Sequence, residues 1–590
     1  MQAASSLSRL DDEITMRVCA NVFCMLSAAN SKGRKMLVER KSTLSDIFGL
    51  MRSHDRTTQV TCGKCACNLL SFPDSQAAAV QAGAVPVLQT ICTLGDPESE
   101  KDCADAFFLI SGSEKFRNEI VKSRVLPVLI MLSRSPNSAT RWSCNRIILN
   151  LAWSASSREA LLSTKAVPAM VALAKSESAI MTAPGGAPDK FAGAEITEMV
   201  AHTLAYLSLN EAYSVQMALD GVVTAVNLIY EAYGSKGAME TRICALAALT
   251  MRALASEPDA LDPMVEQKAV PLLVKVASDA VTTGASPSVF AHCSTALYHL
   301  ASVRKFHALL VEQGALDALA ILGKHKNCYA LVAATCYLLS VTPANREAIA
   351  DHASVPSILI ALAEAEREPD YVSTVTNCAQ CFFKLSKATG KREKLVEAGV
   401  VTQLIRLSKS PLEKVSTNCS EALKNLSSNG EGGIEEGTVA TLIQMSLSGT
   451  SAAAAFLDED AVDGALIPKG SLPPIVEADF TPKEALIPQN RIAEFEPHNI
   501  TFMKMVGGVA GQGPSPPEPP EMDTQDVVDI NVDATDEGEY EEEGNMEKIM
   551  MFAKMEVPET ILMESQSILE EETGTGGDSL ASGDMSVQSR

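Results

Sequence analysis

The sequence predicts an all-α protein built from a three-helix unit that recurs about every forty residues. One marker of the unit is a recurring segment in which apolar residues flank a Pro, as in VQAGAVPVLQTIC (80–92) and VEQKAVPLLVKVA (265–277). The other marker is a Leu, once replaced by Ile, followed by Ser or Ala. A fixed period of this size is typical of solenoid proteins, so both markers indicate a repeat array.

The two markers keep a common register along the chain. The Pro-type position falls at Pro86, Pro127, Pro168, Thr224, Pro271, Asp317, Pro356, Thr402 and Ala440, with Ser45 one step earlier. The Leu-type position falls at Leu26, Leu70, Ile110, Leu151, Leu207, Leu254, Leu300, Leu339, Leu385 and Leu426. The interval between successive markers is about forty residues, and for both markers it lengthens to 56 at the same place. The longer intervals run from Pro168 to Thr224 and from Leu151 to Leu207. This shared exception indicates a true repeat with one insertion.

Each unit is predicted to contain three helices. A short first helix ends at Gly or a small polar residue. The second begins at the Pro, which suits a first helical turn because its missing N–H is not needed there. The longer third helix ends at the Leu-type marker. The insertion, of about fifteen residues within 176–193, lies between second and third helices, and its Gly and Pro content predicts a loop.

This pattern resembles the armadillo repeat, whose motif VxxGAVPxLVxLL precedes a helix ending in NLS or NLA. The resemblance covers residues 5–448, about ten units with incomplete ends. It implies a right-handed superhelix whose third helices line a concave groove for a partner segment. The related HEAT repeat is the alternative, and the Gly-x-(Val/Leu)-Pro junction and short first helix favour armadillo. Residues 1–27 look like a third helix alone, so we expect the array to begin inside a longer one.

The net charge of −24 is concentrated at one end of the chain. From Thr450 onward there are 30 acidic and 7 basic residues, whereas residues 1–449 hold 43 and 42. We therefore predict an array over 1–449 and an acidic tail over 450–590. The Pro- and Gly-containing tail cannot bury enough apolar area to fold and is expected to be mostly disordered. Its short apolar pieces, including ALIP at 465–468 and again at 485–488, are candidate binding motifs or a cover for the end of the array.

No targeting or membrane signal is apparent. The sequence has no run of eighteen uncharged apolar residues, and no secretory, myristoylation or prenylation signal is recognised, so we expect no direct membrane insertion. Fifteen Cys without paired spacing favour reduced thiols. We expect a cytoplasmic protein, with a nuclear, cytoskeletal or ciliary location as alternatives.

The segment CGKCACNLL (62–70) raises the question of a metal or redox site. Counting backward from the Leu-type marker, position −7 holds Cys in six repeats and Gly63, Ala or Val in the others, as in a small buried slot. Position −3 holds Cys67 beside Phe, Ile, Leu and Met in other repeats. No His or second CxxC accompanies Cys62 and Cys65 to complete a zinc site. The sequence favours packed, unliganded thiols.

Catalytic motifs are not apparent. We find no nucleophile elbow, HExxH, P-loop or kinase signature, and GVAGQG (508–513) has the wrong spacing for a dinucleotide site. His292 and His299 are seven residues apart on one predicted helix but lack a neighbouring carboxylate. We therefore predict no enzyme activity, no cofactor and no metal.

The resemblance implies that partners bind at positions −1, −5 and −8 of the third helices. The predicted groove residues are Ser143, Arg146, Asn150, His202, Tyr206, His292, Thr295, His299, Asn377, Gln380, Lys384, Asn418, Glu421 and Asn425. Their amide, imidazole and hydroxyl groups suit an extended peptide backbone. The predicted function is therefore a protein-interaction scaffold or adaptor.

Other functions remain as alternatives. The nuclear-import adaptors that share this repeat have a Trp at −5 and an Asn at −1, but here Trp142 and Trp153 are off that register. A transport receptor, or a substrate-binding module of a ubiquitin-ligase or ciliary assembly, is the alternative. The basic clusters KGRK (32–35) and KATGKREK (387–394) are expected in turns between helices of a neutral array. Nucleic-acid binding is therefore not predicted.

Overall fold

The computed structural model describes residues 2–182, 190–233, 238–365 and 370–427, and every regular element in these ranges is helical. The predicted all-α class is confirmed for the described residues, all of which belong to one structural unit. The predicted boundary at 449–450, the final half-repeat and the acidic tail lie outside them.

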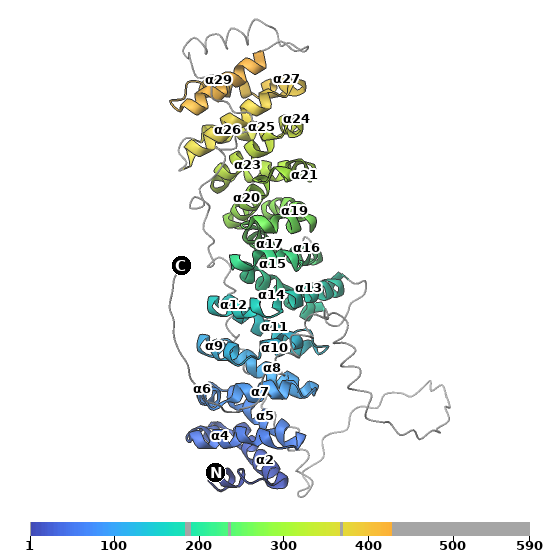
Figure 1. Cartoon of the computed structure of the whole chain (residues 1–590), viewed down its shortest axis with the longest axis vertical. Helices are drawn as coiled ribbons and strands as arrows, with labels where there is room; N and C mark the ends of the chain where they lie inside the picture. The colour runs from blue at the N-terminus through green and yellow to red at the C-terminus, as the bar shows by residue number, and fades with distance from the viewer. Residues whose placement is uncertain (1, 183–189, 234–237, 366–369, 428–590) are drawn as a thin grey trace, which may run out of the picture. The chain divides into compact units, whose positions relative to one another are not determined.

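The helices fall into the predicted sets of three, stacked in chain order (Figure 1). The third helices are α2 (Glu13–Ala29), α5 (Arg56–Leu70), α8 (Pro97–Ser111), α11 (Ser138–Trp153), α14 (Lys190–Ser208), α17 (Ala238–Ala255), α20 (Pro287–Ala301), α23 (Tyr329–Val341), α26 (Tyr371–Ser386) and α29 (Glu413–Ser427). Each packs against the third helix of the next repeat. The predicted three-helix unit is confirmed for the described residues.

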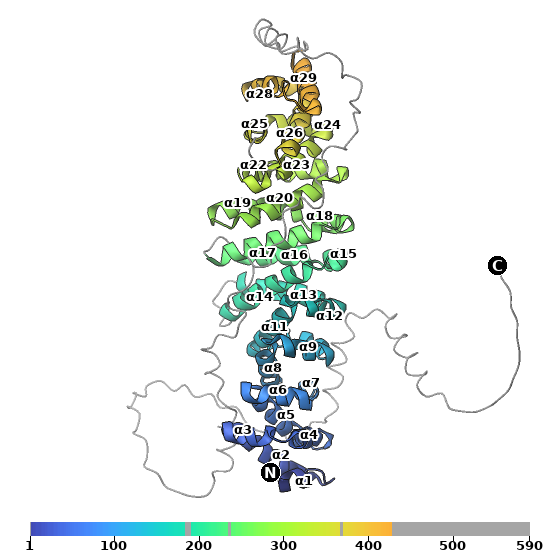
Figure 2. The same cartoon turned by 90° about the vertical axis from the view of Figure 1, so that its left-hand side faces the viewer.

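The other two helices of each repeat are shorter. The first helices are α3 (Ser31–Val38), α6 (Pro73–Ala82), α9 (Glu114–Lys122), α12 (Ala155–Ser163), α15 (Ser214–Leu219), α18 (Leu261–Glu266), α21 (His307–Glu312), α24 (Pro343–Asp351) and α27 (Arg392–Glu397). The second helices are α4 (Lys41–Gly49), α7 (Ala84–Cys92), α10 (Leu126–Leu132), α13 (Ala166–Thr182), α16 (Val222–Tyr233), α19 (Ala269–Thr282), α22 (Ala315–Leu322), α25 (Val355–Glu364) and α28 (Val400–Leu407). Figure 2 shows the same stack from the side.

The junction between first and second helices follows from backbone chemistry. Gly83, Gly221, Gly314 and Gly399 have positive φ there, which Gly adopts without a steric penalty. Arg124 and Lys268 occupy the same junction with φ of 57° and 65° and lack that freedom. The Pro residues that follow lie in the first turns of the second helices, as predicted.

The insertion in the fifth repeat is partly helical. Helix α13 continues to Thr182 and α14 begins at Lys190, so the prediction of a loop over 176–193 is wrong for 176–182 and 190–193. Glu177 and Ser178 are buried in the extended helix, where contacts with neighbouring elements outweigh the local composition. Residues 183–189, with the Gly and Pro residues, lie outside the described residues.

The N-terminal end holds more than a third helix. A helix α1 (Gln2–Leu7) packs against both α2 and α4, which is the place of a second helix in the repeat. Arg9 forms an ion pair of 2.8 Å with Asp46 of α4, and Arg52 donates to the Ser8 carbonyl at 2.8 Å. The expectation that residues 1–27 form a third helix alone is therefore wrong.

A single apolar core runs through the repeats and contains side chains from all three helices of each unit. None of the helices in the described ranges is by itself long and apolar enough to cross a membrane. Only the bent pair Glu211–Leu219 and Val222–Tyr233, with 73° between its parts, passes the test of length and composition together.

Candidate functional site

The fourteen predicted groove residues all lie on third helices, and we call them the third-helix face. Nine of them are buried: Ser143, Asn150, His202, Tyr206, His292, Thr295, Asn377, Lys384 and Asn418. The other five, Arg146, His299, Gln380, Glu421 and Asn425, are half-buried. Position −5 holds three of these five, Arg146, Gln380 and Glu421, and it also holds the buried His202 and Thr295.

Part of this face joins one repeat to the next. Ser143 on α11 donates to a carboxylate oxygen of Asp105 on α8 at 2.6 Å. Asn150, further along the same helix, donates from Nδ2 to the Ser111 hydroxyl at 2.8 Å. In this repeat positions −8 and −1 therefore contact the preceding third helix.

Other residues of the face are held within their own helix. The Thr295 hydroxyl donates to the Ala291 carbonyl at 2.8 Å, and Asn418 Nδ2 donates to the Lys414 carbonyl at 2.7 Å. Glu421 and Lys424 form an ion pair. These bonds fix the rotamers of the side chains before any partner arrives.

The histidines of the face are in different environments. His292 Nδ1 lies 3.0 Å from a guanidinium nitrogen of Arg252, and burial together with Arg252 lowers the pKa of His292 to about 3. His202 lies 3.8 Å from Glu198 and stacks on Tyr206 with 6.1 Å between ring centroids. His292 is buried and His299 half-buried, so the structure does not present them as an equivalent pair.

Several polar atoms of the face have no hydrogen-bond partner among the described residues. Both amide atoms of Asn377 are buried in this state. So are Asn150 Oδ1, Gln380 Oε1 and His202 Nδ1. A buried polar atom without a partner costs about 1–3 kcal/mol of stability, and each of these atoms is enclosed by the packing of the helices.

The cysteine segment is packed within the array. All fifteen cysteines are free, and Cys62, Cys65 and Cys67 are buried. Cys62 Sγ donates to the Ile47 carbonyl at 3.1 Å, and burial raises the pKa of Cys62 and of Cys65. Among the described residues there is no group of three or more His, Cys, Asp or Glu side chains arranged to hold a metal ion.

The structure corrects the register of this segment by one residue. The N-caps Asp55, Asp96 and Asn137 recur at a constant interval, which aligns Leu69, and not Leu70, with Ile110 and Leu151. Position −7 is therefore Cys62 instead of Gly63, and −3 is Ala66 instead of Cys67. The sequence NLLS offers two consecutive Leu residues, and the one before Ser is not the structural equivalent.

The predicted packing of the cysteines is confirmed. The six cysteines that we expected to be buried are Cys67, Cys103, Cys144, Cys293, Cys378 and Cys419, and each is at most 2% exposed. The corrected register adds Cys62 to those at position −7.

Neither Trp contributes to an aromatic ladder at −5. Trp142 packs edge-on against Phe108 with 5.4 Å between ring centroids, and its Nε1 donates to Glu195 at 2.7 Å. The guanidinium of Arg117 lies 5.8 Å from the Trp153 ring. Both indoles are thus engaged in contacts between neighbouring elements.

The basic clusters serve internal contacts. Residues 32–35 lie in helix α3, so their expected place in a turn is wrong, and Arg34 is buried over the Phe72 ring at 3.5 Å. In the second cluster, Lys391 and Lys394 both pair with Asp351.

Sequence reasoning missed the residues that receive the face's hydrogen bonds. Ser27, Ser111 and Ser386 each accept from an Asn of the next repeat. They are the Ser of the Leu-Ser marker, so the signal that located the helix ends also contained these acceptors.

Comparisons with known proteins add similarity of structure only. No family model matches the chain, and no curated protein matches it. An engineered protein determined by the Northeast Structural Genomics Consortium matches with 21% identity over 73% of this chain and 99% of its own, with a TM-score of 0.43. A chain from a study of the phosphorylation-controlled interaction between cadherin and beta-catenin matches with 15% identity over 72% and 90%, TM-score 0.41. A designed armadillo repeat protein matches with 13% identity over 44% and 98%, TM-score 0.31.

Proposed function

We propose that this protein is a non-catalytic interaction scaffold that binds an extended segment of a partner protein along the third-helix face. The observation that carries the proposal is the polar surface that four third helices place on one face, where the half-buried side chains are Arg146, His299, Gln380, Glu421 and Asn425. An amide side chain offers both a donor and an acceptor. An extended peptide backbone needs both at every residue.

The spacing of the repeats supports a peptide partner. Packed helices lie about 8–10 Å apart, and an extended chain advances about 3.3 Å per residue. A bound segment therefore advances about three residues per repeat, so each third helix meets an equivalent backbone group. The third-helix face carries positive and negative side chains together with neutral amides. This mixture does not favour the phosphate groups of a nucleic acid.

The test uses peptides selected from a random library against the full chain. Gln380→Ala removes a half-buried amide of the face, and the matched control Gln216→Ala removes an exposed amide of α15, a first helix. We expect Gln380→Ala to raise the Kd about 5- to 10-fold, the loss of one hydrogen bond. Gln216→Ala should leave the Kd unchanged. Equal binding by both variants, or a library that yields no binder, would overturn the proposal.

A basic peptide serves as a second arm of this assay. Preferential binding of Lys- and Arg-rich peptides would favour the transport-receptor alternative over a general scaffold. We also propose a cytoplasmic site of action, supported by the fifteen free thiols, which persist in a reducing compartment. Imaging of a fluorescent fusion tests the location.

A further inference from the structure

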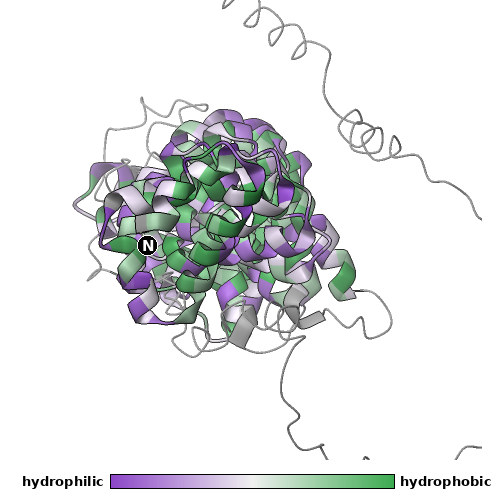
Figure 3. Cartoon of the chain, turned by 90° about the horizontal axis from the view of Figure 1, so that it is seen from below, coloured by the Kyte–Doolittle hydropathy of each residue, from purple (hydrophilic) through white to green (hydrophobic). Residues whose placement is uncertain are grey.

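Large exposed apolar side chains gather at the N-terminal end of the array. Six of them lie on α1, on α2 and in the turn between these helices: Leu7, Leu10, Ile14, Val18, Val22 and Met25. We call these six the α1–α2 patch. Elsewhere in the described chain such side chains occur singly, as at Met131 and Val281. Figure 3 looks along the stack from this end and shows the helices that carry the patch. Scattered apolar residues are normal on a surface, whereas a contiguous group marks an interaction site.

The rest of the array shows what normally covers this face. Positions −1 and −8 bond to the preceding third helix, and position −4 lies between them on the same helical face. Position −4 is buried in all nine later repeats, at Cys65, Ala106, Ile147, Thr203, Thr250, Ala296, Thr335, Cys381 and Ala422. In α2 the same position is Val22, which is 39% exposed, with Val18 at −8 and Met25 at −1 also exposed.

The outer face of α2 carries no charge. Ile14, Val18, Asn21, Val22 and Met25 form a stripe along it, at the three- and four-residue spacing of one helical face.

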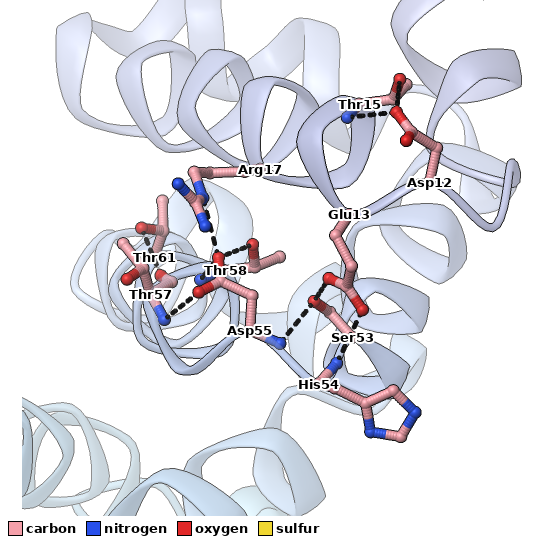
Figure 4. Close-up of polar contacts among 10 residues, drawn as sticks. All are labelled: Asp12, Glu13, Thr15, Arg17, Ser53, His54, Asp55, Thr57, Thr58 and Thr61. Carbon is pink, nitrogen blue, oxygen red and sulfur yellow. Dashed lines mark hydrogen bonds and ion pairs between the residues drawn. The ribbon is translucent and has the colours of Figure 1, made fainter.

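The charged residues of α2 are engaged with the next repeat (Figure 4). Arg17 forms an ion pair of 2.8 Å with Asp55, and Glu13 accepts from the His54 backbone N–H at 3.0 Å. An occupant of the stripe therefore meets apolar side chains and one amide, with no unpaired charge.

We infer that the α1–α2 patch is the contact between two copies of this chain, paired about a two-fold axis. Helix α2 of each copy covers in the other copy the face of α2 that a preceding third helix covers in the later repeats. A two-fold contact requires a patch that complements itself. An uncharged stripe does so without repulsion between like charges. Helix α2, at 17 residues, is about 25 Å long, enough for an antiparallel pair.

The experiment measures the mass of the full chain by sedimentation velocity between about 0.5 and 50 µM. We expect a concentration-dependent dimer. Val18→Glu combined with Val22→Glu should raise the dissociation constant at least 30-fold, because two carboxylates on each copy enter the apolar contact. The matched control is Met131→Glu combined with Val281→Glu, on α10 and α19, which changes exposed apolar residues elsewhere. It should dimerise as the unchanged protein does.

A second variant tests the arrangement without disturbing the patch. Val18→Cys, at an exposed position, should form a disulfide-linked dimer under mild oxidation, whereas Met131→Cys should not. Thermal unfolding of each variant checks that it remains folded. The proposal is overturned by a monomer at all concentrations, by assemblies larger than a dimer, or by a dimer that survives the Glu substitutions. Protection of the thiol introduced by Val18→Cys from labelling in a monomer also overturns it, because another segment would then cover the patch.

Discussion

The amide nitrogen of Asn150 donates to the hydroxyl of Ser111 at 2.8 Å, and this bond joins the third helices of two adjacent repeats. The same bond recurs twice, from Asn68 to Ser27 at 3.0 Å and from Asn425 to Ser386 at 3.0 Å. At another junction the equivalent positions hold Ala301 and Leu338, which are both buried and apolar. Third helices are thus joined by this hydrogen bond at three junctions and by apolar side chains at another.

This alternation predicts the outcome of a double-mutant cycle. Ser111→Ala leaves the buried amide of Asn150 without its acceptor and should lower the free energy of unfolding by about 1–2 kcal/mol. Adding Asn150→Leu reproduces the Ala301–Leu338 junction and should recover most of that loss. Urea unfolding of the two single variants and the double variant measures the coupling. Additive losses would contradict the assignment of the bond.

Asp55 links a helix cap to the preceding repeat. Its carboxylate accepts from the backbone N–H groups of Thr57 and Thr58 and pairs with Arg17. Asp55→Ala should lower stability by about 1–2 kcal/mol, because it removes the cap. Asp55→Asn keeps the cap, as Asn137 does on α11, and should cost less than about 1 kcal/mol for the exposed ion pair. Thermal unfolding of both variants separates the contribution of the helix cap from that of the ion pair. Equal losses of stability in the two variants would assign the effect to the ion pair.

Much of the fold could be predicted from the sequence because the repeat imposes the same packing at each step. The Pro in the first turn of the second helix and the Leu at the end of the third both follow from local chemistry, and both markers agree with the structure. The exceptions were local. The segment NLLS contains two consecutive Leu residues, and either could be the marker. The spacing of the N-caps Asp55 and Asp96 in the structure shows that Leu69 is the marker.

The candidate site was less predictable, because its environment depends on neighbouring repeats. The pattern placed Asn150 and Asn377 on third helices but could not show that both are buried. Burial of a third-helix residue depends on the adjacent helix, which lies one whole repeat away in the sequence. The exposed stripe at Val18 and Val22 was missed for the same reason, since its residue types match those of a core.

The junction residue Lys268 is predicted to store a small strain. It adopts φ of 65° where Gly314 and Gly399 occupy the equivalent junctions of later repeats. A non-Gly residue in this conformation costs about 1–2 kcal/mol, partly offset by the greater freedom of Gly in the unfolded chain. Lys268→Gly should therefore raise stability by up to about 1 kcal/mol. Gly314→Ala, the reverse change, should lower it by about 1 kcal/mol. Urea midpoints measure both, and a destabilised Lys268→Gly variant would contradict the prediction.

His292 makes the array sensitive to acid. Burial and the neighbouring Arg252 lower its pKa to about 3, whereas an exposed His has a pKa near 6.5. The unfolded chain therefore binds a proton that the folded chain does not, so stability is complete above about pH 6.5 and falls as the pH drops toward 3. His292 alone should lower the free energy of unfolding by about 2 kcal/mol between pH 7 and pH 5.

The measurement compares stability at pH 7 and pH 5. His292→Gln should reduce the difference between the two pH values, since Gln does not titrate. The unchanged protein, measured at the same two pH values, is the reference. An identical acid loss in the His292→Gln variant would assign the sensitivity to other groups.

The buried thiols are predicted to be inert in the folded protein. Cys144 is fully buried on α11, and burial raises its pKa, so very little reactive thiolate forms near neutral pH. A thiol reagent should label it only as fast as the array opens, whereas the added thiol of the Val18→Cys variant should react at once in the monomer. Cys144→Ala should lower stability by about 1 kcal/mol or somewhat more, for lost packing alone. Elemental analysis of the purified protein completes the test, because one equivalent of zinc that disappears in a Cys62→Ser, Cys65→Ser variant would show that these sulfurs bind metal and do not merely pack.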